Sequence, residues 1–265
     1  MIRSVLSKFN VAQGLIVTTT LGAAIFSAST VSADQIGVFA GASAWQQDFD
    51  GFVSDLDAAT PVEVNFQDDL GLDENDSNVI YVALEHPIPF LPNLQLKRTS
   101  IEIDGANTLD RQIEYGGQTF NVSTAIVSEA DLSHTDVTAY YQLLDNYVSL
   151  DLGLTARFFD GFVEIQDDTG ANSGRVEFDS PVPLLFVKAR ADLPLSGAYV
   201  SVSGNALGDG DNSFTDMQGT IGWESDYGLG VEAGYRILDL ELDDLDDVSA
   251  ELTIDGAFAG LMYHF

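Results

Sequence analysis

The fold is decided by residues 147–159, which read YVSLDLGLTARFF. From Val148 to Phe158 every second residue is apolar, and the residues between them are polar, charged or glycine. Side chains of a β-strand alternate between the two faces of a sheet, so this stretch predicts a strand with one apolar face and one polar face. A surface helix would instead repeat its apolar positions about every 3.6 residues.

The same alternation recurs along the chain. Residues 228–237 set Leu229, Val231 and Tyr235 against glycines, Glu232 and Arg236. Similar segments lie at 35–46, 78–86, 94–104, 134–144, 182–192, 197–206, 214–224 and 252–265. Together these segments predict an all-β chain of ten antiparallel strands, with eight as the alternative count.

The predicted connections between strands differ in length. Short links lie at 87–93, 145–146, 193–196 and 225–227, and mostly longer links lie at about 47–77, 105–133, 160–181, 207–213 and 238–251. Short turns at one end and long loops at the other are typical of a transmembrane up-and-down β-barrel of the bacterial outer membrane. An even number of strands places both termini at the short-turn end, which faces the periplasm in such barrels.

A water-soluble β-sandwich or barrel is the alternative, because its strands also alternate. A soluble fold packs large apolar side chains inward and places charge outside. Here the polar face is rich in glycine, serine and threonine and carries charges of both signs, as expected for a narrow, hydrated barrel interior. The apolar face carries aromatic residues near strand ends, which suit a membrane interface: Phe158, Trp223, Tyr235 and Tyr263.

The C-terminus favours the membrane barrel. Leu261, Tyr263 and Phe265 share one face of the last predicted strand. A terminal aromatic residue with a second one two positions earlier resembles the signal that the outer-membrane barrel-assembly machinery reads. The alternative is a soluble edge strand that ends in phenylalanine.

Residues 1–33 predict a secretory signal peptide. Arg3 and Lys8 precede an apolar stretch from Leu15 to Phe26, and Val31-Ser32-Ala33 offers a cleavage site before Asp34. The apolar stretch is shorter than the roughly 20 residues of a membrane-spanning helix. We therefore expect a mature chain of residues 34–265, a single barrel in the outer membrane of a Gram-negative bacterium.

Charge and composition exclude several classes of protein. The 265-residue chain carries 42 acidic and 10 basic residues and no cysteine. Without a basic surface the chain is not expected to bind nucleic acid. Without cysteine it has neither disulfide bonds nor thiolate metal sites. Removal of the signal peptide leaves 42 acidic and 8 basic residues, a net charge of −34.

Strand parity predicts a network of charges inside the barrel. Several acidic and basic residues occupy the strand positions between the apolar ones, so their side chains should point into the lumen. Because an unpaired charge in a confined site is costly, we expect them to pair. Lys97 and Arg98 are adjacent, so one of the two must face outward and extend to the lipid headgroups. The predicted lumen residues are Asp136, Asp151, Arg157, Lys188, Arg190, Asp192, Glu232 and Arg236.

Acidic residues concentrate in two of the long links. Residues 48–76 and 239–251 contain no basic residue, and they carry ten and seven acidic residues respectively. As extracellular loops they would lie beside lipopolysaccharide, where divalent cations could bridge the two. A solvated acidic surface is the simpler alternative.

Catalytic motifs are scarce in this sequence. Ser133 and His134 are adjacent, so on a strand they point to opposite faces and cannot act as nucleophile and base together. His134 and Asp136 share a face, which leaves a lipid- or peptide-hydrolysing enzyme as the weakest hypothesis. Gly116-Gly117 predicts the turn of a small hairpin. We expect no enzymatic activity and no cofactor.

The chain resembles an outer-membrane β-barrel family named for a Gly-Gly motif and found in proteobacteria. The most distinctive stretch is residues 84–93, which read LEHPIPFLPN. Further matching stretches are 150–154, 159–161, 183–186, 233–236 and 256–265. The resemblance implies the fold and an outer-membrane location but no activity. The sequence therefore predicts a structural or surface role with cation-attracting loops, or alternatively a narrow, porin-like channel that prefers cations.

Overall fold

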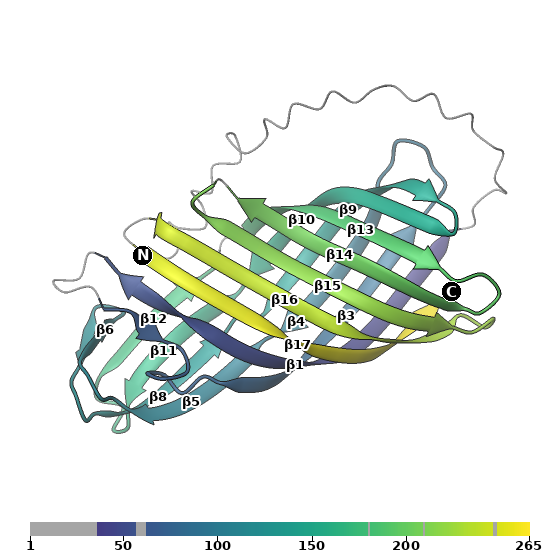
Figure 1. Cartoon of the computed structure of the whole chain (residues 1–265). Helices are drawn as coiled ribbons and strands as arrows, with labels where there is room; N and C mark the ends of the chain where they lie inside the picture. The colour runs from purple at the N-terminus through teal and green to yellow at the C-terminus, as the bar shows by residue number, and fades with distance from the viewer. Residues whose placement is uncertain (1–35, 57–61, 180, 209, 246–247) are drawn as a thin grey trace.

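The computed structural model describes residues 36–56, 62–179, 181–208, 210–245 and 248–265 (Figure 1). The predicted signal peptide, residues 1–33, lies outside these ranges. Within them the chain forms strands, turns and irregular segments, and no helix is long and apolar enough to cross a membrane.

Ten strands form one closed antiparallel barrel. Each strand pairs with its neighbours in chain order, and the last pairs with the first to close the barrel. The barrel strands are β1 (Gly37–Asp55), β3 (Glu74–Glu85), β4 (Asn93–Ser100), β9 (His134–Asp145), β10 (Val148–Phe159), β13 (Pro181–Asp192), β14 (Ala198–Gly208), β15 (Ser213–Glu224), β16 (Leu229–Leu245) and β17 (Val248–His264). The predicted fold class and the count of ten strands are confirmed, and the alternative count of eight is wrong.

The two faces of the barrel wall differ in polarity. Ile80, Leu154 and Leu229 point outward and are more than half exposed, whereas Thr138 and Thr155 point inward and are buried. A soluble barrel would bury its apolar face, so this arrangement suits a wall surrounded by lipid. The outward side chains include the four predicted interface aromatics Phe158, Trp223, Tyr235 and Tyr263, and the C-terminal residues Leu261 and Phe265.

Three barrel strands continue beyond the apolar band, where their polarity reverses. β1, β16 and β17 were predicted to occupy only 35–46, 228–237 and 252–265, but they reach Asp55, Leu245 and Val248 and pair with one another. In β16 the apolar residues point outward up to Ile237, and from Leu238 onward they point inward while the acidic residues point outward. Such a reversal is expected where the surroundings of a barrel wall change from lipid to water.

A second sheet lies at the long-loop end of the barrel, away from the C-terminus (Figure 1). Its strands are β5 (Glu102–Thr108), β8 (Ala125–Asp131), β11 (Gly161–Asp167) and β12 (Ser173–Phe178), in the spatial order β12-β11-β8-β5. β6 (Ile113–Tyr115) and β7 (Gln118–Phe120) form the predicted hairpin, and Gly116 and Gly117 at its tip have φ of 56° and 73°. β2 (Val64–Asn65) pairs with β1. Much of the predicted long links is therefore strand.

The strand predicted at 94–104 is divided between the two sheets. β4 ends at Ser100 and β5 begins at Glu102, with Ile101 fully buried between them. The Ile101 amide donates to Ser133 Oγ at 2.9 Å, and its carbonyl accepts from the Leu132 amide at 2.8 Å. These bonds satisfy the backbone where the chain leaves the barrel for the second sheet.

Candidate functional site in the barrel lumen

The structure divides the eight predicted lumen residues into two groups. Asp136, Arg157 and Arg236 are buried near the long-loop end of the lumen. The other five line a cavity near the short turns: Asp151, Lys188, Arg190, Asp192 and Glu232.

A buried ion-pair network crosses the lumen. The Arg157 guanidinium donates to both carboxylate oxygens of Asp136, at 2.7 and 2.8 Å. It also donates to Asp216, which accepts two further bonds from Arg236 at 2.7 and 2.8 Å. Lys97 lies 3.5 Å from the second oxygen of Asp136. Five charged side chains from β4, β9, β10, β15 and β16 are thereby linked.

Neutral polar side chains extend this network across the barrel. Thr155 Oγ1 lies 2.8 Å from Thr138 Oγ1 and donates to Asn205 Oδ1 at 2.7 Å. Arg236 Nη1 donates to Thr99 Oγ1 at 3.3 Å. Arg157 is 0% exposed and Arg236 is 2% exposed. Their guanidinium groups therefore make hydrogen bonds to these protein side chains instead of to water.

Aromatic rings cover the network. The Arg236 guanidinium lies 4.4 Å from the centre of the Trp45 ring, and Arg157 lies 5.3 Å from that of Phe214. The Trp45 indole nitrogen donates to the Gly256 carbonyl at 3.2 Å across the β1–β17 seam. A Cβ at Gly256 would lie 1.9 Å from the Gln46 carbonyl oxygen, so only glycine permits this approach.

An apolar core fills the space between the network and the second sheet. It combines Phe49, Leu238 and Ile254 of the long barrel strands with buried residues of the second sheet such as Ile126 and Ile165. The ion-pair network and this core together obstruct the lumen at the long-loop end. We call the two layers the plug.

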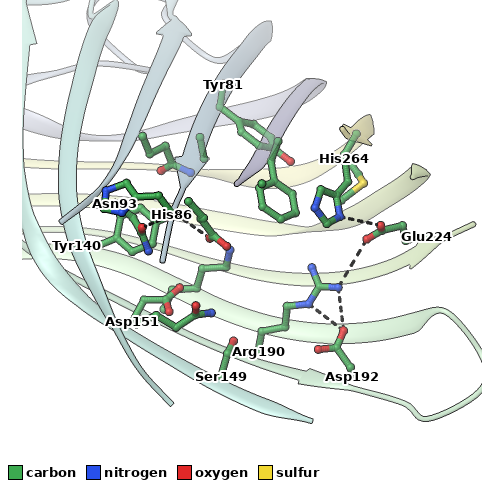
Figure 2. A pocket seen from close by; sticks show the side chains of 18 of the residues that line it. Tyr81, His86, Asn93, Tyr140, Ser149, Asp151, Arg190, Asp192, Glu224 and His264 are labelled. Atoms are coloured by element: carbon green, nitrogen blue, oxygen red, sulfur yellow. Dashed lines mark hydrogen bonds and ion pairs between the residues drawn. The ribbon is translucent and has the colours of Figure 1, made fainter. Parts of the chain in front are cut away.

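The other half of the lumen contains a polar cavity of about 450 Å³ (Figure 2). Its lining includes residues at the strand ends beside the short turns, among them Glu85, Asn146, Asp192 and His264. The cavity therefore opens toward the short turns.

Hydrogen bonds fix most of the carboxylates of the cavity. The Tyr140 hydroxyl donates to Glu85 at 2.8 Å, and the Tyr199 hydroxyl donates to Glu232 at 2.5 Å. Arg190 donates to Asp192 at 2.8 and 2.9 Å. Glu224 lies 3.1 Å from His264 Nδ1 and 3.9 Å from Arg190 (Figure 2).

Two members of the network are not among the eight lumen residues predicted from the sequence. One is Asp216, which shares the inward face of its predicted strand with Gln218 and Thr220. Lys97 proves to be the inward member of the Lys97–Arg98 pair, and Arg98 instead contacts Thr135 Oγ1 at 3.3 Å. Both residues could have been found from strand parity, because each occupies a position between outward-facing residues of its strand.

The hydrolase hypothesis finds little support in the geometry. His134 is fully buried, with Nδ1 3.0 Å from the Leu132 carbonyl, and Ser133 Oγ accepts the Ile101 amide. Ligand atoms of His134, Asp136 and Asp216 lie within 4.8 Å of one another, as a metal site would require. Both carboxylates already accept bonds from guanidinium groups, so a cation there would have to displace arginine.

Comparison with known proteins gives distant structural similarity and no family. No protein-family model matches the chain, and neither does any curated protein. The resemblance to the Gly-Gly family therefore gains no support from a family model.

Among solved structures, the chain is similar to the translocator domain of the autotransporter NalP from Neisseria meningitidis. Identity is 9%, 88% of this chain and 90% of that chain are covered, and the TM-score is 0.44. It is also similar to Ail from Yersinia pestis, at 14% identity, 86% and 99% coverage and a TM-score of 0.29. A third similar structure is a FadL homologue of Pseudomonas aeruginosa, at 11% identity, with 86% of this chain and 90% of that chain covered and a TM-score of 0.34. Scores this low carry no functional argument, and the fold assignment rests on the topology described above.

Proposed function

We propose that this chain is an integral outer-membrane protein of a Gram-negative bacterium, without enzymatic activity, whose barrel is closed and holds a rigid β-sheet at the cell surface. The plug is the observation that carries the proposal. A conducting barrel needs a continuous aqueous path, and Trp45, Arg157 and Arg236, each at most 2% exposed, lie across the lumen.

The location is part of the proposal and is supported by the polarity of the wall. The apolar band faces outward, and the short turns would lie in the periplasm with the C-terminal residue. The outward Leu261, Tyr263 and Phe265 are available for recognition by the barrel-assembly machinery. We also propose that the chain belongs to the Gly-Gly family, because residues 84–93 resemble its sequences.

Planar-bilayer conductance of the refolded protein tests the closed barrel. We expect no conductance steps from protein whose folding is verified by its heat-modifiable mobility on an unboiled gel. Cation-selective steps that change when Arg157 or Arg236 is neutralised would contradict a closed barrel and support the alternative, a narrow cation-preferring channel. One observation favours this alternative: acidic residues outnumber lysine and arginine around the cavity.

The proposal includes lipopolysaccharide and divalent cations as partners at the membrane edge. Outward carboxylates lie on β1, β16 and β17 just beyond the apolar band, and we call them the carboxylate stripe: Asp48, Asp50, Asp239, Glu241, Glu251 and Asp255. Asp48 faces Asp255, and Glu241 faces Glu251, in the strand register. Facing like charges repel, and a divalent cation shared with a lipid phosphate would relieve the repulsion.

Retention of lipopolysaccharide tests the carboxylate stripe. In buffer with Mg²⁺, we expect the double variant Glu241→Gln/Glu251→Gln to retain several-fold less lipopolysaccharide during purification than the wild type. The double variant Glu114→Gln/Glu177→Gln removes the same charge from exposed positions in the β6–β7 hairpin and in β12 and should match the wild type. Equal retention by all three proteins, with or without a chelator, would reject cation bridging by the stripe.

A further inference from the structure

The cavity at the short-turn end has no part in the function proposed above. Its volume of about 450 Å³ falls within the range of roughly 300–1,000 Å³ found for small-molecule sites. Its floor is the closed half of the barrel, so a ligand would enter and leave on the same side.

Acidic groups exceed basic groups on the cavity wall. The wall carries five carboxylates, one lysine and one arginine, together with the histidines His86 and His264. The charged lining residues are Glu85, Asp151, Asp192, Glu224 and Glu232, with Lys188 and Arg190. A ligand that complements this wall is therefore a cation.

The excess negative charge can be traced to particular carboxylates. Arg190 pairs with Asp192 and approaches Glu224, and Lys188 faces Asp151 across the β10–β13 pair. Glu85 and Glu232 accept their described bonds from tyrosine hydroxyls, which are neutral donors. These bonds orient the two carboxylates but do not cancel their charge. A carboxylate offers about four acceptor positions, so further donors can be received.

The carboxylates are spread around the wall rather than gathered at one point. Glu85 lies on β3, Asp151 on β10 and Glu232 on β16. A metal ion needs several oxygens at roughly 2.0–2.6 Å from one centre. Among the described residues, the one group close enough to share an ion is His134 with Asp136 and Asp216, which lies in the plug and not in this cavity.

Aromatic and amide side chains complete the lining. Tyr81, Tyr140 and Asn93 lie at the cavity (Figure 2). Phe39 adds a further ring and Gln142 a further amide. Aromatic faces attract ammonium groups and pack against methylene chains, and amide oxygens accept ammonium hydrogens.

We propose that this cavity binds a small linear organic polyamine. Separate ammonium groups would reach Glu85 and Glu232 on different parts of the wall, and the methylene segments between them would lie along the aromatic rings. The described residues of this cavity include no group of three ligands close enough to share one metal ion, and an anionic ligand would meet an excess of like charge.

Calorimetric titration of the refolded protein with spermidine tests the proposal. We expect saturable binding to the wild type in a zwitterionic detergent, at an ionic strength high enough to screen the exposed acidic surface. The double variant Glu85→Gln/Glu232→Gln should raise the Kd for spermidine at least tenfold. Its heat-modifiable mobility should stay that of the wild type, which shows that the barrel has folded.

A matched variant separates the cavity from the general acidity of the chain. Glu114→Gln/Glu129→Gln removes two charges from exposed positions at the long-loop end and should leave the Kd unchanged. An equal loss of affinity in both double variants would mean nonspecific attraction to the surface and would overturn the proposal. Absence of saturable binding, or full competition by Mg²⁺ at constant ionic strength, would overturn it as well. None of these outcomes depends on whether the barrel conducts.

Discussion

Asp216 holds the two arginines of the plug at one carboxylate. It accepts bonds from both Arg157 and Arg236 and is 3% exposed. Removing the negative partner of a buried network leaves uncompensated positive charge in a site that water cannot reach. The variant Asp216→Asn keeps the shape of the side chain and removes its charge. We expect it to lower the free energy of unfolding by about 3–5 kcal/mol.

Urea unfolding in micelles, followed by Trp45 fluorescence in a Trp223→Phe background, measures this effect. Trp45 is a suitable probe because its ring lies against the Arg236 guanidinium. The control is Asp192→Asn, whose side chain is 39% exposed in its pair with Arg190 and should cost at most about 1 kcal/mol. If the two variants lost equal stability, the network would be no stronger than a surface ion pair.

Strand parity gives the direction of a charged side chain but not the grouping of the charges. Arg157 and Asp136 are buried inside the barrel, and their direction depends only on their position in a strand. Whether two inward charges meet depends on the stagger between strands, which brings Arg236 of β16 beside Thr99 of β4. Local sequence carries no such information.

Strands β1, β16 and β17 illustrate what alternation reveals at the scale of the element. Their extensions were predicted as acidic loops, because the apolar residues change face at Leu238 and the acidic residues between them resemble a loop composition. The direction of successive side chains goes on alternating through Leu238, because β16 continues there as a strand. A reversal of polarity within one period-two segment therefore does not indicate the end of the strand.

Glu164 of β11 accepts hydrogen bonds from Ser173 and Arg175 of β12. Bonds from Gln166, Ser173 and Arg175 lower the pKa of Glu164 from 4.5 to about 2. Because the pKa is lowered in the folded chain, the stabilisation is complete above about pH 4.5 and is lost as the pH falls toward 2. Between these values we expect pepsin to cleave the β11–β12 connection progressively faster.

The variant Glu164→Gln should remove most of this pH dependence. At pH 4.5 pepsin should cleave the variant faster than the wild type. The ratio of the two cleavage rates should fall toward one as the pH is lowered to 2, because the wild type then loses the same stabilisation. Glu114→Gln, at an exposed position of the nearby hairpin, should follow the wild type throughout. A constant ratio for Glu164→Gln would mean that this carboxylate does not stabilise the pairing.

The whole barrel was predictable because one pattern repeats in every strand. Period two, short turns and an apolar outward face are local features, and closure follows once ten such strands pair in chain order. The second sheet was not predicted, because it forms from two links that lie far apart in the sequence. Ser128 of β8 faces Ile165 of β11 in the register, and only the folded barrel brings these strands together.

Barrel and second sheet should unfold as one unit, because they share one core. Ile165 belongs to the second sheet and is fully buried with Phe49 and Ile254 of the barrel strands. Ile165→Ala should therefore destabilise the barrel too, by about 2–5 kcal/mol. In a Trp223→Phe background, the Trp45 signal and protease resistance of the second sheet should be lost at the same urea concentration. Val127→Ala, at a position 49% exposed, should leave both unchanged. Loss of the sheet in Ile165→Ala while the Trp45 transition stays in place would divide the molecule into two independent domains and contradict a rigidly held surface sheet.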